Sequence, residues 1–251
     1  SPLGLGGGIL YVPIMHYMLN WEIRESLVVS LTLVLMVSIG SSMAHSKSGF
    51  ADQNAARLGR ISASPSAIIG VLLSGFLLSV VGGVGIKIIA AVIISFVIER
   101  TIRNALSEAE QESSSEKKLS TNQTKYIIGS SFAGISSGIL GIGGGAILVT
   151  INRSILKMDA KKAAGTSYMI VSMIVPIALF SHIIMSQNLE LIVDKAGVVA
   201  IILIPLLVLL SAYYGAKYAI QYLPKQVVTS VFLIVVSISL LRYLYDLFSF
   251  V

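Results

Sequence analysis

The chain has 251 residues, of which 55% are hydrophobic and only 12% are charged, and its mean hydropathy is +0.87. A soluble domain carries about 25% charged residues, so this composition excludes an ordinary soluble globular protein. The formal net charge is +6, but no basic patch is interleaved with aromatic residues, so we expect no nucleic-acid partner. The absence of cysteine excludes disulfides and thiolate metal sites.

Long apolar runs follow one another along the chain. They cover 26–45, 61–81, 84–99, 163–185, 196–216 and 226–248. A hydrocarbon core about 30 Å thick takes about 20 helical residues to cross, and each run reaches or approaches that length. We therefore predict an all-α polytopic membrane protein surrounded by a lipid bilayer.

An internal repeat relates the two halves of the sequence. The segment Gly4-Leu5-Gly6-Gly7-Gly8 returns as Gly141-Ile142-Gly143-Gly144-Gly145, an offset of 137 residues. The same offset pairs Val12 with Val149, Leu19 with Leu156, Ser30 with Ser167, Met36 with Met173, and His45 with His182. Such self-similarity indicates two homologous units. Each unit is predicted to be a four-helix-type repeat in which glycines break a re-entrant helix.

The only long polar stretch separates the two units. It covers 103–125 and is rich in Ser, Glu, Lys and Gln, a composition that buries little apolar surface. We therefore divide the chain into a first transmembrane repeat (1–102), a polar cytoplasmic linker (103–125) and a second transmembrane repeat (126–251). The apolar lead-in at 125–140 has a counterpart that would mostly precede residue 1, so we expect the first repeat to be truncated at its N-terminus.

Two orientations of the repeats are open. If each repeat crosses the membrane four times, the Lys and Arg residues divide 10 to 8 between the two sides. If the glycine-broken segment instead returns to its own side, the second repeat is inverted and the division becomes 14 to 4. Cytoplasmic loops carry an excess of Lys and Arg, so the inverted arrangement is favoured.

The glycine turns are the candidate binding site. Broken apolar helices in corresponding places of two repeats point to a transporter site. A half-helix that begins after the glycines directs its free N–H groups at the turn, which favours an anion. The substrate-binding glycines on this interpretation are Gly6, Gly7, Gly8, Gly143, Gly144 and Gly145. The alternative is that the glycines only allow close helix packing, with no ligand.

Hydroxyl and imidazole side chains near the turns are further candidates. Ser30, Thr166 and Ser167 are placed to donate to an oxyanion, or alternatively to bond back to a carbonyl of their own helix. His45 and His182 are proton-coupling candidates because histidine titrates near neutral pH. The alternative is that each interacts with the last carbonyls of its helix.

The residue types and motifs that the sequence lacks reduce the number of possible functions. The acidic residues lie in loops, in the linker or at the ends of the apolar runs, whereas cation pathways usually carry embedded carboxylates. No ATP-binding Gly-rich loop and no His-Glu-x-x-His motif is present. We therefore expect no enzyme activity, no cofactor and no metal site.

The motifs resemble those of the sulfite exporter TauE/SafE family. The resemblance rests on the Gly-x-Gly-Gly-Gly segment and Val12-Pro13, on its echo at 141–149, and on the paired serines and histidines. It covers nearly the whole chain and implies transport of a small sulfur oxyanion or organosulfonate. Thr150 departs from the pattern, which expects proline there.

We therefore predict a secondary transporter or facilitator of a small anion, sulfite or an organosulfonate, in the cytoplasmic (inner) membrane of a prokaryote. An anion channel and a non-transporting membrane scaffold remain alternatives. A homodimer is also left open.

Overall fold

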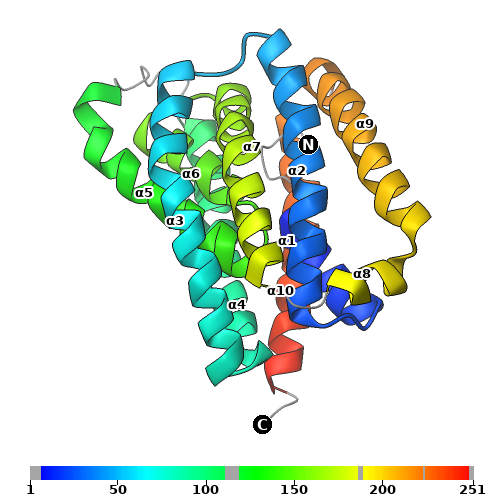
Figure 1. The fold of residues 1–251 in the computed structure, drawn as a ribbon. Coiled ribbons are helices and arrows are strands. Elements are labelled where there is room, and N and C mark those ends of the chain that lie inside the picture. The colour runs from blue at the N-terminus through cyan, green and yellow to red at the C-terminus, as the bar shows by residue number, and fades with distance from the viewer. Residues whose placement is uncertain (1–6, 111–118, 186–188, 223, 249–251) are drawn as a thin grey trace.

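The computed structural model describes residues 7–110, 119–185, 189–222 and 224–248, and every regular element in these ranges is helical (Figure 1). The elements are α1 (Gly8–Pro13), the π-helix η1 (Ile14–Met18), α2 (Ile23–Lys47), α3 (Gln53–Val80), α4 (Gly83–Glu110), α5 (Leu119–Leu140), α6 (Gly145–Ile155), α7 (Ala160–Met185), α8 (Leu189–Ala196), α9 (Val198–Tyr222) and α10 (Lys225–Phe248). Among the described residues, five segments are long and apolar enough to cross a membrane, namely α2, α3, α7, α9 and residues Thr229–Phe248 of α10. The predicted all-helical membrane fold is confirmed.

Two predicted segments differ in detail from the structure. The apolar run 84–99 lies in α4, which is not among the five spanning helices. The run contains Lys87 and ends at Glu99, and the uncharged stretch 88–98 between them makes only about 16 Å of helix. Helix also extends into the polar linker from both sides, since α4 continues to Glu110 and α5 begins at Leu119. The remaining part of the linker, 111–118, lies outside the described residues.

Backbone contact between α3 and α5 holds one side of the bundle together. A side-chain carbon at Gly70 would overlap the carbonyl oxygen of Ile135, and one at Gly134 would overlap that of Ala63. Gly138 makes a third contact of this kind with α3. Between membrane helices there is little hydrophobic driving force, so close packing through small residues supplies the association.

Helix α2 occupies the centre of the other side, between α7 and α9 (Figure 1). A side-chain carbon at Gly40 would lie 2.6 Å from the carbonyl oxygen of Leu209 in α9. Beyond this contact α9 is peripheral, because only 6% of its apolar window is buried. Its exposed surface is apolar, which suits contact with lipid tails.

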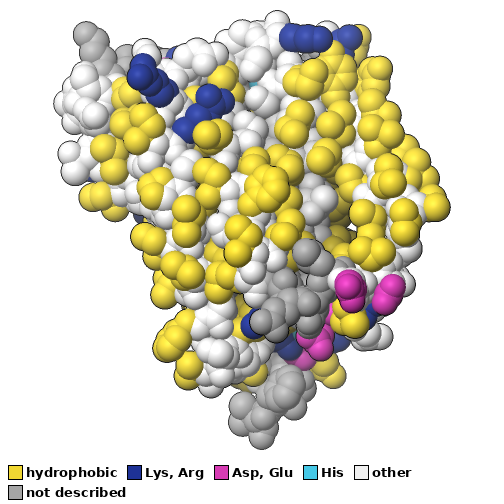
Figure 2. Space-filling view, viewed as in Figure 1, with side chains coloured by type: hydrophobic (Ala, Val, Ile, Leu, Met, Phe, Trp, Pro, Cys, Tyr) yellow, Lys and Arg dark blue, Asp and Glu magenta, His cyan; other side chains and the backbone are white. Residues whose placement is uncertain are grey.

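Ion pairs lie at both ends of the bundle. At one end, called here the Asp52 end, Lys162 lies 3.8 Å from Asp52. At the other, the Glu25 end, Lys195 Nζ donates to Glu25 at 2.7 Å. Figure 2 shows most of the visible Lys and Arg at the upper end, the visible Asp and Glu at the lower end, and hydrophobic side chains over the band between them.

The α3–α5 contact yields a matched pair of stability predictions. We expect Gly134→Ala to destabilise the protein by about 1–3 kcal/mol, because overpacking a filled contact forces the backbones apart. Gly215→Ala in α9 is the control, since nothing lies within 4 Å of an added side-chain carbon there. That variant should be neutral or stabilising, because alanine favours helix over glycine.

Thermal unfolding of both variants in detergent, followed by loss of the monodisperse chromatographic peak, measures the difference. Equal melting temperatures for Gly134→Ala and the parent protein would contradict the close contact.

Candidate functional site

The second glycine turn links α5 to α6 and is fully buried. Gly141, Gly143 and Gly144 have φ of 64°, 77° and 68°, a left-handed backbone that other residues adopt only with strain. A side-chain carbon at Gly143 would also overlap Val34 of α2, and one at Gly144 would lie 2.6 Å from the carbonyl oxygen of Ala133. The break therefore requires glycine both for its conformation and for its space, as the repeated motif predicts.

Helix α6 begins at this turn and forms a hairpin with α5. It has 11 residues, so it is about 16 Å long and too short to cross a bilayer. Its first N–H groups have no partner within the helix and point back at the turn. The turn lies midway along the bundle, since Gly143 faces Val34 in α2 and Val171 and Val175 in α7.

The first glycine turn contacts the second. Gly7, with φ of 71°, precedes α1, and α1 continues directly into η1. A side-chain carbon at Gly8 would overlap the backbone of Ile142. The two turns are therefore packed together, backbone against backbone. Gly6 lies outside the described residues.

The two equivalent serines both bind the second turn. Ser30 Oγ donates to the carbonyl oxygen of Gly141 at 2.7 Å, and Ser167 Oγ donates to that of Gly145 at 3.0 Å. Both side chains are completely buried. The serines therefore lie beside the glycines, as the candidate site requires, but these bonds hold the turn from both sides rather than bonding back within α2 or α7.

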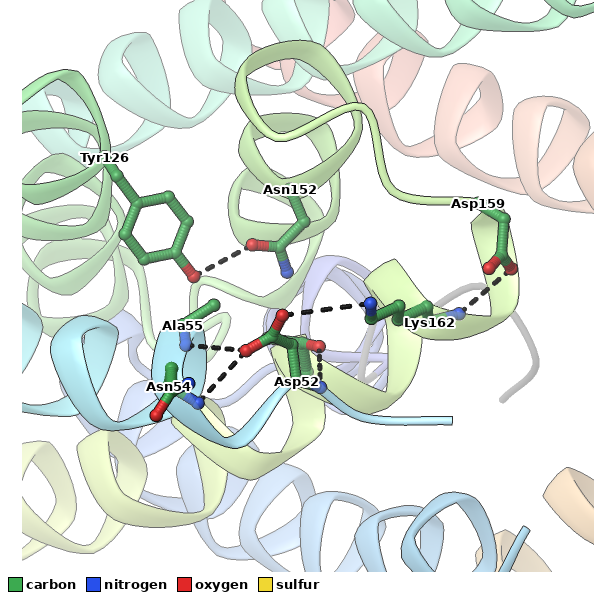
Figure 3. A network of polar contacts seen from close by, with 8 residues as sticks. Asp52, Asn54, Ala55, Tyr126, Asn152, Asp159 and Lys162 are labelled. Atoms are coloured by element: carbon green, nitrogen blue, oxygen red, sulfur yellow. Dashed lines mark hydrogen bonds and ion pairs between the residues drawn. The ribbon is translucent and has the colours of Figure 1, made fainter. Parts of the chain in front are cut away.

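Thr166 has a different partner. Its Oγ1 accepts a hydrogen bond from the backbone N–H of Asp52 at 2.9 Å. The Asp52 carboxylate in turn caps α3 by accepting from the N–H groups of Asn54 and Ala55, each at 3.0 Å (Figure 3). Thr166 thus fastens the α2–α3 connection to α7 and is not directed at the glycine turns.

A buried polar pair also joins the hairpin to α7. Tyr126 Oη donates to Asn152 Oδ1 at 2.9 Å (Figure 3). Asn152 Nδ2 donates to the Ala163 carbonyl at 3.1 Å. The sequence analysis did not select these residues. Asn152 could have been selected from the sequence, because it lies in an apolar half-helix and a buried amide needs hydrogen-bond partners.

The two predicted proton-coupling histidines have different surroundings. His182 Nε2 donates to the Gly138 carbonyl at 2.8 Å, one turn before the glycine break. For His45, neither ring nitrogen has a hydrogen-bond partner in the described part of the chain. His45 lies beside Gly165 at the start of α7, and His182 is 17 residues further along that helix. At 1.5 Å per residue this is about 25 Å, so the structure does not bring the two together.

The carboxylates of the spanning helices lie at the Glu25 end and are neutralised there. Glu25 is only 2% exposed and binds Lys195. Asp246 at the end of α10 forms an ion pair with Lys87 of α4 and accepts a hydrogen bond from Tyr17 at 3.3 Å. No group of three or more potential metal ligands occurs among the described residues.

Comparisons with known proteins identify the family of the chain. Neither the curated proteins nor the solved structures gave a match. The family described as Sulfite exporter TauE/SafE matches residues 1–243 of the 251-residue chain. The chain is an integral membrane protein, because its apolar helices are long enough to cross a bilayer. The family that it matches is a family of transporters. The chain belongs to the sulfite exporter TauE/SafE family.

Proposed function

We propose that this protein is a secondary transporter that moves a small sulfur-containing anion, sulfite or an organosulfonate, across the membrane. The observation that carries the proposal is the buried glycine break in the middle of the bundle, in a chain of this family. There the first N–H groups of α6 present partial positive charge without a permanent cation. Irregular backbone at this depth persists only where protein buries it or where it lines a cavity.

The residues around the break favour an anion over a cation. The segments that surround it, 26–47, 119–158 and 160–185, contain no Asp or Glu. Cation and proton pathways through membranes usually carry embedded carboxylates. A backbone site also suits a small oxyanion, because each N–H group donates to one oxygen. The glycine turns form the proposed substrate site, and Ser30 and Ser167 hold the second turn in place by donating to the Gly141 and Gly145 carbonyls.

We further propose that the two repeats are inverted and exchange access by rocking against one another. The 14 to 4 division of Lys and Arg supports this arrangement. The ends of the helices agree with it, since the Asp52 end carries the α2–α3 and α6–α7 connections. The Glu25 end carries α8 and the α3–α4 connection, which lies against Ile23. On this arrangement the linker side is cytoplasmic.

Transport is tested with purified protein in proteoliposomes. We expect saturable uptake of sulfite or sulfoacetate, accelerated by the same anion inside the vesicle, with sulfate, thiosulfate and taurine as competitors of graded strength. Protein-free vesicles are the control. Uptake that does not saturate and shows no acceleration would indicate a channel, and no uptake of any member of the panel would contradict the proposed function.

Topology is tested with single cysteines, because the chain has none of its own. We expect Ser120→Cys and Ser154→Cys to react with a membrane-impermeant maleimide from the cytoplasmic side, and Asp194→Cys to react from the opposite side. Intact cells and inverted vesicles give the two labelling directions. Labelling of Ser120→Cys and Ser154→Cys from different sides would reject the inverted arrangement.

A further inference from the structure

Helices α2 and α7 are equivalent in the repeat, which allows their buried polar residues to be compared position by position. At the offset of 137 residues, Ser30 corresponds to Ser167, Ser41 to Ala178, and His45 to His182. The first of these pairs behaves alike in both halves, because both serines hold the second glycine turn. The other two pairs do not.

In the second half both positions are satisfied. His182 donates to the Gly138 carbonyl at 2.8 Å, so it stabilises the end of α5. Ala178 is buried and has no polar atom. The Nε2 N–H of His182 is therefore engaged with protein, and the position four residues before it offers no hydroxyl group.

In the first half both positions carry buried polar atoms without partners. His45 and Ser41 are each 0% exposed. Within the described residues, neither ring nitrogen of His45 nor the hydroxyl of Ser41 makes a hydrogen bond. The residues are four apart, so they lie on the same face of α2. Leaving buried polar groups unpaired is costly, and each such group calls for an explanation.

The surroundings of this pair suit a ligand that enters from the Asp52 end. The ring of His45 lies 5.7 Å from that of Tyr168 in α7. The α2–α3 connection folds back over His45, with Phe50 N–H donating to the His45 carbonyl at 3.1 Å. The Lys161 ammonium lies 5.5 Å from the centre of the Phe50 ring, so positive charge borders the connection.

The connection is joined to α7 by packing and by polar contacts. A side-chain carbon at Gly165 would overlap the carbonyl oxygen of Phe50, so the two backbones touch there. The charged tie of the connection, Asp52 to Lys162, spans 3.8 Å, and the two side chains are 30% and 28% exposed. Ion pairs of this kind contribute little to stability. The hydrogen bond from the Asp52 N–H to Thr166 also joins the connection to α7. Movement of residues 48–52 away from α7 would uncover His45, and it would have to separate the Phe50 backbone from Gly165.

We propose that His45 and Ser41 form an oxyanion-binding subsite in the first half of the protein, for which the second half has no counterpart. This rests on the transport function proposed above and adds a second binding position for the anion, about 16 Å along α2 from the level of the glycine turns and nearer the Asp52 end. An imidazole N–H of His45 and the hydroxyl of Ser41 donate to the oxygens of one small oxyanion, which reaches them beneath residues 48–52. The repeat is thus symmetric in fold and asymmetric in chemistry.

Matched variants separate this role from a structural one. His45→Leu and Ser41→Ala should each lower sulfite or sulfoacetate uptake at least tenfold, with a melting temperature equal to or above that of the parent protein, because each removes an unpaired buried group. His182→Leu should lower the melting temperature, because it leaves the Gly138 carbonyl without its donor. Ala178→Ser is the control and should leave uptake unchanged. The subsite is rejected if His45→Leu and Ser41→Ala transport like the parent, or if His45→Leu is destabilised as His182→Leu is.

A binding measurement distinguishes failure of the subsite from failure of the transport function. The chain has 3 histidines, so ¹⁵N-histidine labelling gives few signals, and His45→Leu and His182→Leu assign two of them. Titration with sulfite or sulfoacetate should shift the His45 signals and leave those of His16 and His182 in place. A His45 shift in a protein that transports none of the panel would support the subsite and reject the transport function. Unmoved His45 signals in a protein that does transport would reject the subsite alone.

Discussion

The architecture depends on one buried piece of left-handed backbone, the turn at 141–144. Its left-handed residues end α5 in the middle of the bundle and turn the chain back as α6. A turn at this depth has carbonyl groups that water does not reach, so other helices must satisfy them. Ser30 and Ser167 do so from α2 and α7. The helices that surround the turn are therefore fixed relative to it by hydrogen bonds as well as by packing.

Close backbone contact through glycine also joins two other pairs of helices. Glycine allows the backbones of α3 and α5 to touch, and it allows α2 to lie against α9 through Gly40. Contact through backbone makes these pairs rigid, because no flexible side chain lies between them. By contrast, the exposed apolar surface of α9 is held by few specific contacts. Motion during transport is expected where the contacts are few.

The charged residues of the spanning helices lie at the ends of the bundle. Glu25 and Asp246 are paired with lysines from distant parts of the chain, at the end opposite Asp52. Removing either partner would leave a buried or half-buried charge uncompensated, which costs more than the pair itself contributes. The middle of the bundle has no such fixed charge in the segments around the glycine break. An anion there would be bound by backbone N–H dipoles, which release it more readily than a lysine would.

Composition, apolar run length and internal repetition were enough to predict a helical membrane protein and the position of the glycine break, and the family was suggested by the resemblance of its motifs. These features are local or periodic, so the order of residues carries them directly. The partners of individual polar groups were beyond the sequence, because they depend on which helices meet. Ser30 reaches a carbonyl 111 residues away, and Thr166 binds the α2–α3 connection instead of the turn. The repeat shows that His45 and His182 are equivalent in sequence. Only the tertiary structure distinguishes them, because the end of α5 supplies a carbonyl to His182 and no described residue supplies a partner to His45.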